Sequence, residues 1–191
     1  MKRLMTLALG IIIGLFWITV LPGCGGPKGE ARSHMKKGDE IVVLIEKNSK
    51  TLVAKMDKTF SNLYKQMNSG KTPDAAAFDI SAKEITVLAE KMLDKASLAK
   101  AEYGMIRRLK GVPDYVKYAE MKIKVIDSNF QGLKQLQDFL AEGKKKLAAQ
   151  PFDPVAFQIA VVQFSDSMKK LGEESGKLQK QAEDLKKQKK L

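Results

Sequence analysis

Three proline-containing turn clusters divide most of this chain into four segments of similar length. The clusters span residues 70–74, 111–114 and 150–154. In each, a proline stands where a helix would begin, and proline fits the first helical turn because its missing N–H would have no partner there. Glycine opens the first two clusters, as is typical of a helix end. We therefore predict four helices, over residues 39–69, 73–110, 113–149 and 154–189.

Side chains at the expected helix starts support these boundaries. Thr72 and Asp153 are good N-caps because their oxygens accept hydrogen bonds from the first backbone N–H groups of a helix. Asp39 stands at the expected start of the first helix and would cap it in the same way. Residues 81–84, Ser-Ala-Lys-Glu, form a capping box. The second helix would therefore bend there or begin late.

Apolar residues recur at steps of three and four along all four segments. The last segment has the longest unbroken heptad seam: Phe157, Val161, Phe164, Met168, Leu171, Ser175, Leu178, Ala182 and Leu185. No segment alternates with period two, as a half-buried strand would. Short turns force neighbouring helices to run antiparallel. The pattern predicts an all-α, up-down-up-down antiparallel four-helix bundle over residues 39–191.

A different pattern precedes the helices. Lys2 and Arg3 are followed by an apolar run over residues 4–21 and then by Pro-Gly-Cys. A basic start, an apolar middle and small residues before a cleavage point are the parts of a secretory signal. The alternative is an uncleaved membrane helix, because about 18 apolar residues lie near the lower limit for spanning a bilayer.

Leu21-Pro22-Gly23-Cys24 resembles the lipobox of bacterial lipoproteins, in which an aliphatic, a variable and a small residue precede a cysteine. Pro22 departs from the small or β-branched residue that is more usual there. The resemblance implies removal of residues 1–23, a thioether-linked diacylglycerol on Cys24 and an acyl chain such as palmitate on its amino group. Glycine at position 25, where aspartate would favour inner-membrane retention, implies an outer-membrane lipoprotein that faces the periplasm. The resemblance covers the leader alone.

Residues 24–38 predict a flexible tether between anchor and bundle, because they hold several glycines, a proline and few apolar side chains. Without Lys2 and Arg3 the formal charge falls from +12 to about +10. A basic exported domain favours anionic neighbours, and export excludes nucleic acid. The candidate contact residues are the C-terminal lysines Lys186, Lys187, Lys189 and Lys190. The alternative interpretation is that they complement the helix dipole.

Residues suited to catalysis or cofactor binding are sparse. The single histidine, His34, falls in the expected tether without a second histidine or cysteine nearby, and predicts a solvated imidazole rather than a metal ligand. Haem and di-iron bundles need histidines on their helices. The helical methionines predict core filling rather than copper(I) binding: Met56, Met67, Met92, Met105, Met121 and Met168. We therefore expect no enzyme activity, metal or cofactor.

Together these features predict a lipid-anchored, non-enzymatic protein of the bacterial cell envelope. It would act as a binding or assembly module, attached to the membrane through Cys24 and contacting an envelope protein or an anionic polymer. The alternative is a carrier or sensor for a small apolar ligand. Its cavity would be lined by residues such as Phe60, Met92, Phe130 and Phe164. The polar gap in the last seam, at residues 172–176, predicts close helix packing, a kink or a shallow pocket.

Overall fold

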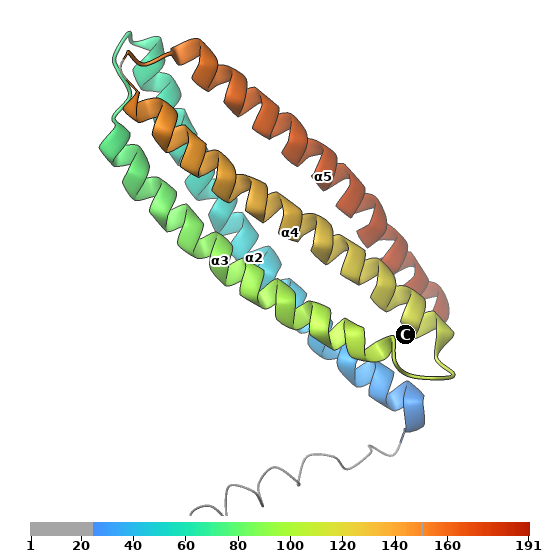
Figure 1. The fold of residues 1–191 in the computed structure, drawn as a ribbon. Helices are drawn as coiled ribbons and strands as arrows, with labels where there is room; N and C mark the ends of the chain where they lie inside the picture. Colours follow the sequence, from blue (N-terminus) through green and yellow to red (C-terminus); the bar gives the residue numbers. More distant parts are fainter. Residues whose placement is uncertain (1–24, 150) are drawn as a thin grey trace, which may run out of the picture.

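The computed structural model describes residues 25–149 and 151–191. This part of the chain forms four α-helices and no strand: α2 (Gly26–Asn68), α3 (Ala75–Ile106), α4 (Pro113–Ala148) and α5 (Pro154–Lys189). Figure 1 shows them side by side and alternating in direction, with short turns at the two ends. The predicted all-α four-helix bundle is confirmed. The leader and Cys24 lie outside the described residues.

The helix ends follow the turn clusters with small corrections. Asp153 accepts hydrogen bonds from the backbone N–H groups of Val155 and Ala156, both at 3.0 Å, and so caps α5 as predicted. The cap of α3 is Asp74, which accepts from Ala77 N, so the prediction of Thr72 was wrong. The helix α3 runs without a break through residues 81–84, so it does not begin late, and it ends at Ile106 rather than at residue 110.

The first helix is longer than predicted. It begins at Gly26, so the expectation of a flexible tether over 24–38 is wrong from Gly26 onward. Ala31, Met35 and Gly38 of this stretch are buried against the bundle. The sequence misled because the packed positions include small residues rather than large apolar ones. A Cβ atom on Gly38 would lie 2.7 Å from Cζ of Tyr103, so glycine is what lets α2 approach α3 so closely.

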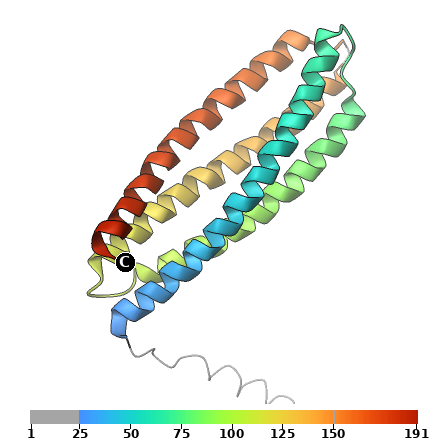
Figure 2. The same cartoon turned by 180° about the vertical axis from the view of Figure 1, so that it is seen from behind.

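Helices adjacent in sequence pack along each other: α2 with α3, α3 with α4, and α4 with α5. Helices α2 and α5, the first and last of the bundle, do not pack along each other in this way (Figure 2). The consequence is clearest in α5, where Phe157, Ala182 and Leu185 are its buried residues. These three lie at the ends of the predicted seam. Between them the seam is only partly covered.

Candidate functional site

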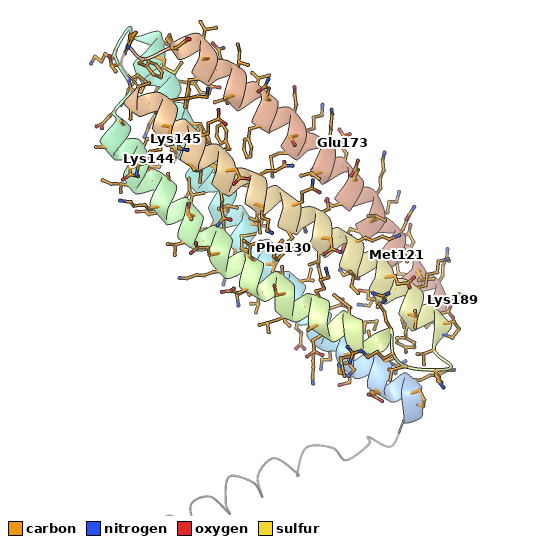
Figure 3. The ribbon with its side chains drawn as sticks, viewed as in Figure 1. Met121, Phe130, Lys144, Lys145, Glu173 and Lys189 are labelled. Atoms are coloured by element: carbon orange, nitrogen blue, oxygen red, sulfur yellow. The ribbon has the colours of Figure 1, made fainter. Side chains whose placement is uncertain are left out.

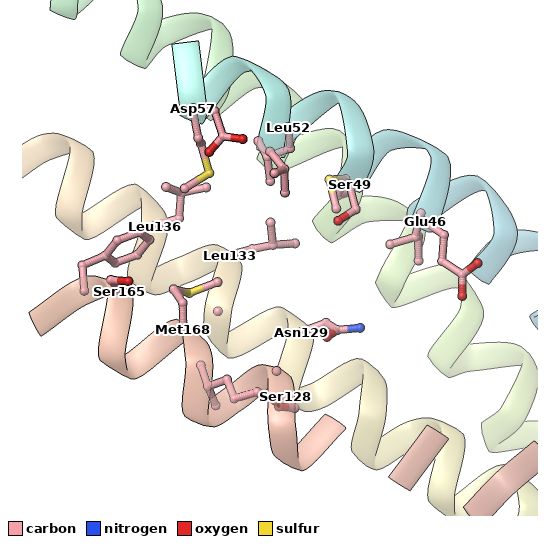
Figure 4. Close-up of a pocket in the computed structure, with 18 of the residues that line it drawn as sticks. Glu46, Ser49, Leu52, Asp57, Ser128, Asn129, Leu133, Leu136, Ser165 and Met168 are labelled. Carbon is pink, nitrogen blue, oxygen red and sulfur yellow. Dashed lines mark hydrogen bonds between the residues drawn. The ribbon is translucent and has the colours of Figure 1, made fainter. Parts of the chain in front are cut away.

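A cavity of about 480 Å³ opens between α2, α4 and α5, at the middle of the α5 seam. Its apolar walls come from all three helices, with Met92 reaching in from α3. The walls comprise Ile45, Leu52, Val53, Met56 and Phe60 of α2, Leu133 and Leu136 of α4, and Val161, Phe164, Met168 and Leu171 of α5. Figure 4 looks into this space; we call it the α2–α5 groove. Its size lies within the range of small-molecule sites in proteins, about 300–1,000 Å³.

Small side chains leave the groove unfilled. Gly132 on α4 is buried in its floor, where an added Cβ would lie 3.2 Å from the terminal methyl of Met168. Gly172 and the serines at 49, 128 and 165 also line it. Gly172 belongs to the polar gap in the predicted seam, so of the three readings offered for that gap, a pocket fits the structure. Larger residues at these positions would have filled the space between α2 and α5.

Three aromatic rings close the end of the groove nearest the α4–α5 turn. Phe139 of α4 stacks on Phe164 of α5 with centroids 4.4 Å apart, and Phe60 of α2 lies 5.6 Å from Phe139. Three of the four residues predicted for an apolar cavity, Phe60, Met92 and Phe164, do line it. Phe130 does not; the Nζ atom of Lys134 lies 5.2 Å from its ring centroid instead (Figure 3).

The rim of the groove is acidic. Glu46 and Asp57 of α2 are the charged residues that line it, and no lysine or arginine of the described chain does so. Neither carboxylate forms an ion pair with another described residue. The remaining polar groups are neutral, namely the serines and Asn129. An apolar slot with an acidic rim is unexpected in a chain with a formal charge of +12.

A polar cluster lies beyond the other end of the groove and joins all four helices. One oxygen of Asp39 (α2) accepts hydrogen bonds from the hydroxyls of Tyr103 (α3) and Tyr118 (α4), at 2.6 and 2.7 Å. The other oxygen pairs with Nζ of Lys186 (α5) at 2.6 Å. We call these four residues the Asp39 cluster. Asp39 therefore lies inside a helix, and the prediction that it caps one was wrong.

Electrostatics hold the Asp39 cluster in one protonation state. Burial alone would raise the pKa of Asp39, but the hydrogen bonds from Lys186, Tyr103 and Tyr118 outweigh burial and lower this pKa below its usual value. Burial, and then the hydrogen bond to the carboxylate, raise the pKa of Tyr103 and of Tyr118. Both phenols therefore stay protonated as donors. Because both oxygens of Asp39 accept hydrogen bonds, this carboxylate links the helices and does not act as a base.

Lys122 adds a second polar contact beside the cluster. Its side chain is 3 % exposed, and Nζ donates to Oε1 of Gln179 at 3.0 Å, with Glu183 at 3.9 Å. Burial lowers the pKa of Lys122, and the nearby carboxylates, Asp39 first, oppose that shift. Among the described side chains no buried polar atom lacks a hydrogen-bond partner. This end of α5 is therefore held by polar contacts on both α2 and α4.

Sequence reasoning missed the Asp39 cluster, although one signal was present. Tyr103 stands on the apolar seam of α3 in register with Ala96, Ala99 and Ile106, and all four are buried. A buried tyrosine hydroxyl usually needs a partner. The sequence could thus have predicted a polar contact at Tyr103, but not that its partner would be Asp39.

The candidate C-terminal lysines do not form one shared surface. Lys186 belongs to the Asp39 cluster, and Nζ of Lys189 lies 3.6 Å from Asp114 (Figure 3). Lys187 and Lys190 are exposed. The structure thus gives two of the four lysines partners inside the protein.

The histidine is not the solvated imidazole that the sequence predicted. Nδ1 of His34 lies 2.7 Å from Glu102 of α3, and the side chain is 18 % exposed. His34 therefore contributes to the packing of α2 on α3. In residues 25–149 and 151–191, no group of three or more histidine, cysteine, aspartate or glutamate side chains could hold a metal ion.

None of the described helices carries an apolar stretch sufficient to cross a bilayer. The chain matches no family model, no curated protein and no solved structure.

Proposed function

We propose that this protein is a lipid-anchored, non-enzymatic binding module of the bacterial cell envelope, and that the α2–α5 groove is its binding site. The observation that carries the proposal is an apolar cavity of about 480 Å³ between α2, α4 and α5. The ligand class it favours is small and apolar, which makes the carrier or sensor the better-supported form of the module.

Contacts at both ends of the groove hold α5 in place. The Phe60, Phe139 and Phe164 rings join the three helices at one end, and the Asp39–Lys186 pair joins α2 to α5 at the other. A site that exists before the ligand arrives avoids much of the entropic cost of ordering side chains on binding. A preformed, apolar slot with a few neutral polar groups has the usual character of a small-molecule site.

A fluorescence titration with a neutral apolar probe, N-phenyl-1-naphthylamine, tests the groove. The protein used begins at Gly25, because the four helices and the described core lie within residues 26–191. We expect saturable binding that Ser49→Phe weakens by about tenfold or more, equivalent to about 1.4 kcal/mol. Ser61→Phe is the matched control, since Ser61 is an exposed residue of the same helix and does not line the groove.

Equal binding by wild type and Ser49→Phe, with both shown to be folded by circular dichroism, would rule out the groove as the binding site. Mass spectrometry of protein from bacterial membranes tests the anchor separately. We expect an amino terminus at Cys24 that carries the mass of its lipids. An intact leader with an unmodified thiol would contradict the lipoprotein assignment.

A second candidate function, contact with anionic headgroups, is favoured by how the charges are placed. The start of α2, the α3–α4 turn and the end of α5 lie at one end of the bundle (Figure 1). Exposed basic residues gather in these three segments: Lys36, Lys37, Arg107, Arg108, Lys110, Lys187 and Lys190. Because α2 begins only two residues after Cys24, a lipid there would bring this end to the membrane surface.

Sedimentation with vesicles tests this candidate. The protein beginning at Gly25 should bind anionic vesicles at low salt, bind less at high salt and ignore neutral ones. Lys187→Glu/Lys190→Glu should weaken the binding more than Lys71→Glu/Lys145→Glu. The second pair changes the net charge equally but lies in the α2–α3 turn and near the end of α4, outside the three basic segments. No binding to anionic vesicles at low salt would reject the candidate.

A further inference from the structure

The groove is elongated along the helices. Its lining on α2 extends from Ile45 to Phe60, which is about 22 Å at 1.5 Å per residue. On α5 it extends from Val161 to Gly172, or about 16 Å. An apolar groove of this length can hold a single extended alkyl chain along its axis.

The charges of the groove select among such chains. Glu46 and Asp57 lie on the α2 side, about 16 Å apart along the helix, near the two ends of the lined stretch (Figure 4). No cation of the described residues lines the slot with them. Lys122 lies near Glu46, because the two residues line an adjoining cavity and Glu46 opposes the lowering of the Lys122 pKa. A ligand carboxylate or phosphate would therefore meet uncompensated negative charge mainly at the Asp57 end. An ammonium group would pair with a carboxylate that has no described ion-pair partner.

The groove is also apolar enough to strengthen that preference. Leu52 and Leu133 are buried within it, and Met56, Phe60 and Phe164 are partly buried. Charges beside a low-dielectric surface interact more strongly than charges surrounded by water. Serine and asparagine at positions 49, 128, 129 and 165 supply neutral donors and acceptors in the same groove. An alkyl chain in the slot would therefore keep its headgroup at a polar, acidic edge.

We propose that the α2–α5 groove binds a single-chain amphiphile with a cationic headgroup, such as a long-chain amine or quaternary ammonium compound. This inference rests on the proposed function, because it names the class of ligand for the same groove. The alkyl chain lies along the Leu52, Leu133 and Met168 wall, and the cation pairs with Asp57, the rim carboxylate that lies away from Lys122. Fatty acids and anionic single-chain lipids bind more weakly, although the protein as a whole is basic.

Displacement of the neutral probe by two amphiphiles of equal chain length tests the charge preference. We use n-decylammonium and decanoate below their micelle concentrations, with the folded protein that begins at Gly25. Decylammonium should displace the probe at about a fivefold lower concentration than decanoate, since one exposed ion pair contributes up to about a fivefold gain. In Glu46→Gln/Asp57→Asn this ratio should fall to about twofold or less.

Glu90→Gln/Asp94→Asn is the matched control. Both residues are exposed on α3 and neither lines the groove, so this double change alters the net charge equally without touching the rim. It should keep the wild-type preference. Loss of the preference in both double variants would overturn the proposal, because the effect would then belong to the overall field. Equal displacement by the two amphiphiles, or tighter binding of decanoate, would also overturn it.

These results are separable from a failure of the groove itself. If both amphiphiles displace the probe equally and Ser49→Phe blocks the probe, the groove is the binding site and only its charge preference is refuted. If Ser49→Phe leaves the probe bound as tightly as before, the proposed function fails and this inference fails with it.

Discussion

The Asp39 cluster and the α2–α5 groove both lie where α2 and α5 face each other, but only the cluster joins the two helices directly. At the cluster, α5 is joined to α2 by the Asp39–Lys186 pair, with Tyr103 and Tyr118 completing the hydrogen bonds of the carboxylate. At the groove, α5 presents apolar side chains to α2 and the space between them stays open.

The contrast shows that apolar character alone does not close a helical bundle. The seam of α5 is apolar along most of its length, but its buried residues are at the ends, where Phe157 and Leu185 lie. In the middle, Gly132, Gly172 and the serines supply too little volume to fill the interface. Rigidity is therefore concentrated at the ends, and the middle keeps the space that a ligand requires.

Of the changes considered, removal of the Asp39 carboxylate should lower the stability of the protein most. Asp39→Ala leaves the half-buried Lys186 unpaired and two tyrosine hydroxyls without their acceptor, so the free energy of unfolding should fall by about 3 kcal/mol. Urea denaturation followed by circular dichroism measures it. Asp94→Ala, an exposed change on α3, should alter stability by less than about 0.5 kcal/mol. Similar losses in the two variants would refute a structural role for the cluster.

Two glycines test how tightly each region is packed. Gly38→Ala places a Cβ atom 2.7 Å from the buried ring of Tyr103, so we expect a loss of about 1–3 kcal/mol. Gly104→Ala is the control, because beyond its own helical turn no described residue comes within 4 Å of its Cβ position. It should stabilise the protein by up to about 1 kcal/mol through helix propensity.

The same substitution in the groove should be tolerated better. The Cβ of Gly132→Ala would lie 3.2 Å from the methyl end of Met168, a flexible side chain beside open space. We expect a stability change within about 1 kcal/mol of wild type, smaller than that of Gly38→Ala. A loss at Gly132 as large as that at Gly38 would show that the groove is as tightly packed as the α2–α3 contact.

The Asp39 cluster should also make stability depend on pH, with a smaller effect than these substitutions. The folded-state pKa of Asp39 is lowered, so its contribution is present above the unfolded value, about 3.9, and is lost as pH falls through the folded value. The surface carboxylates Asp79 and Glu84, whose pKa values are also lowered, act in the same direction. Asp39→Asn should therefore lose less stability than wild type between neutral pH and pH about 3. Parallel pH profiles would contradict the assignment.

Filling the groove should have the smallest effect on stability. Ser49→Leu adds apolar volume beside Leu52 and Leu133, and we expect the free energy of unfolding to rise by up to about 1 kcal/mol while probe binding weakens. A marked loss of stability with unchanged probe binding would indicate that the space is not open in solution.

Much of the fold could be predicted because its signals are local. Proline and glycine placed the turns, Asp153 marked the start of α5, and the steps of three and four described one apolar face per helix. The start of α2 could not be found this way, because Gly38 is buried by contact with Tyr103, a residue far along the chain. From composition alone, residues 26–38 resemble a spacer. In the structure Gly38 is a packing residue, because it permits the close approach of α2 to Tyr103.

The candidate site was predicted only in part for the same reason. Phe60, Met92 and Phe164 stood on apolar seams and could be named as cavity residues. Whether seam residues meet or leave a space depends on the volume of the side chains that face them from other helices. The two carboxylates of the rim, Glu46 and Asp57, carry no sequence signal of their own, since exposed acids are common on helix surfaces.

The sequence by itself determined the helices, their order and their antiparallel course, because caps, turns and periodicity act over a few residues. Only the tertiary structure decided which polar side chains meet and where the bundle stays open. Asp39, Tyr103, Tyr118 and Lys186 are brought together from four helices. The groove exists because small residues of α2, α4 and α5 line the same level of the bundle, and no short-range pattern records that alignment.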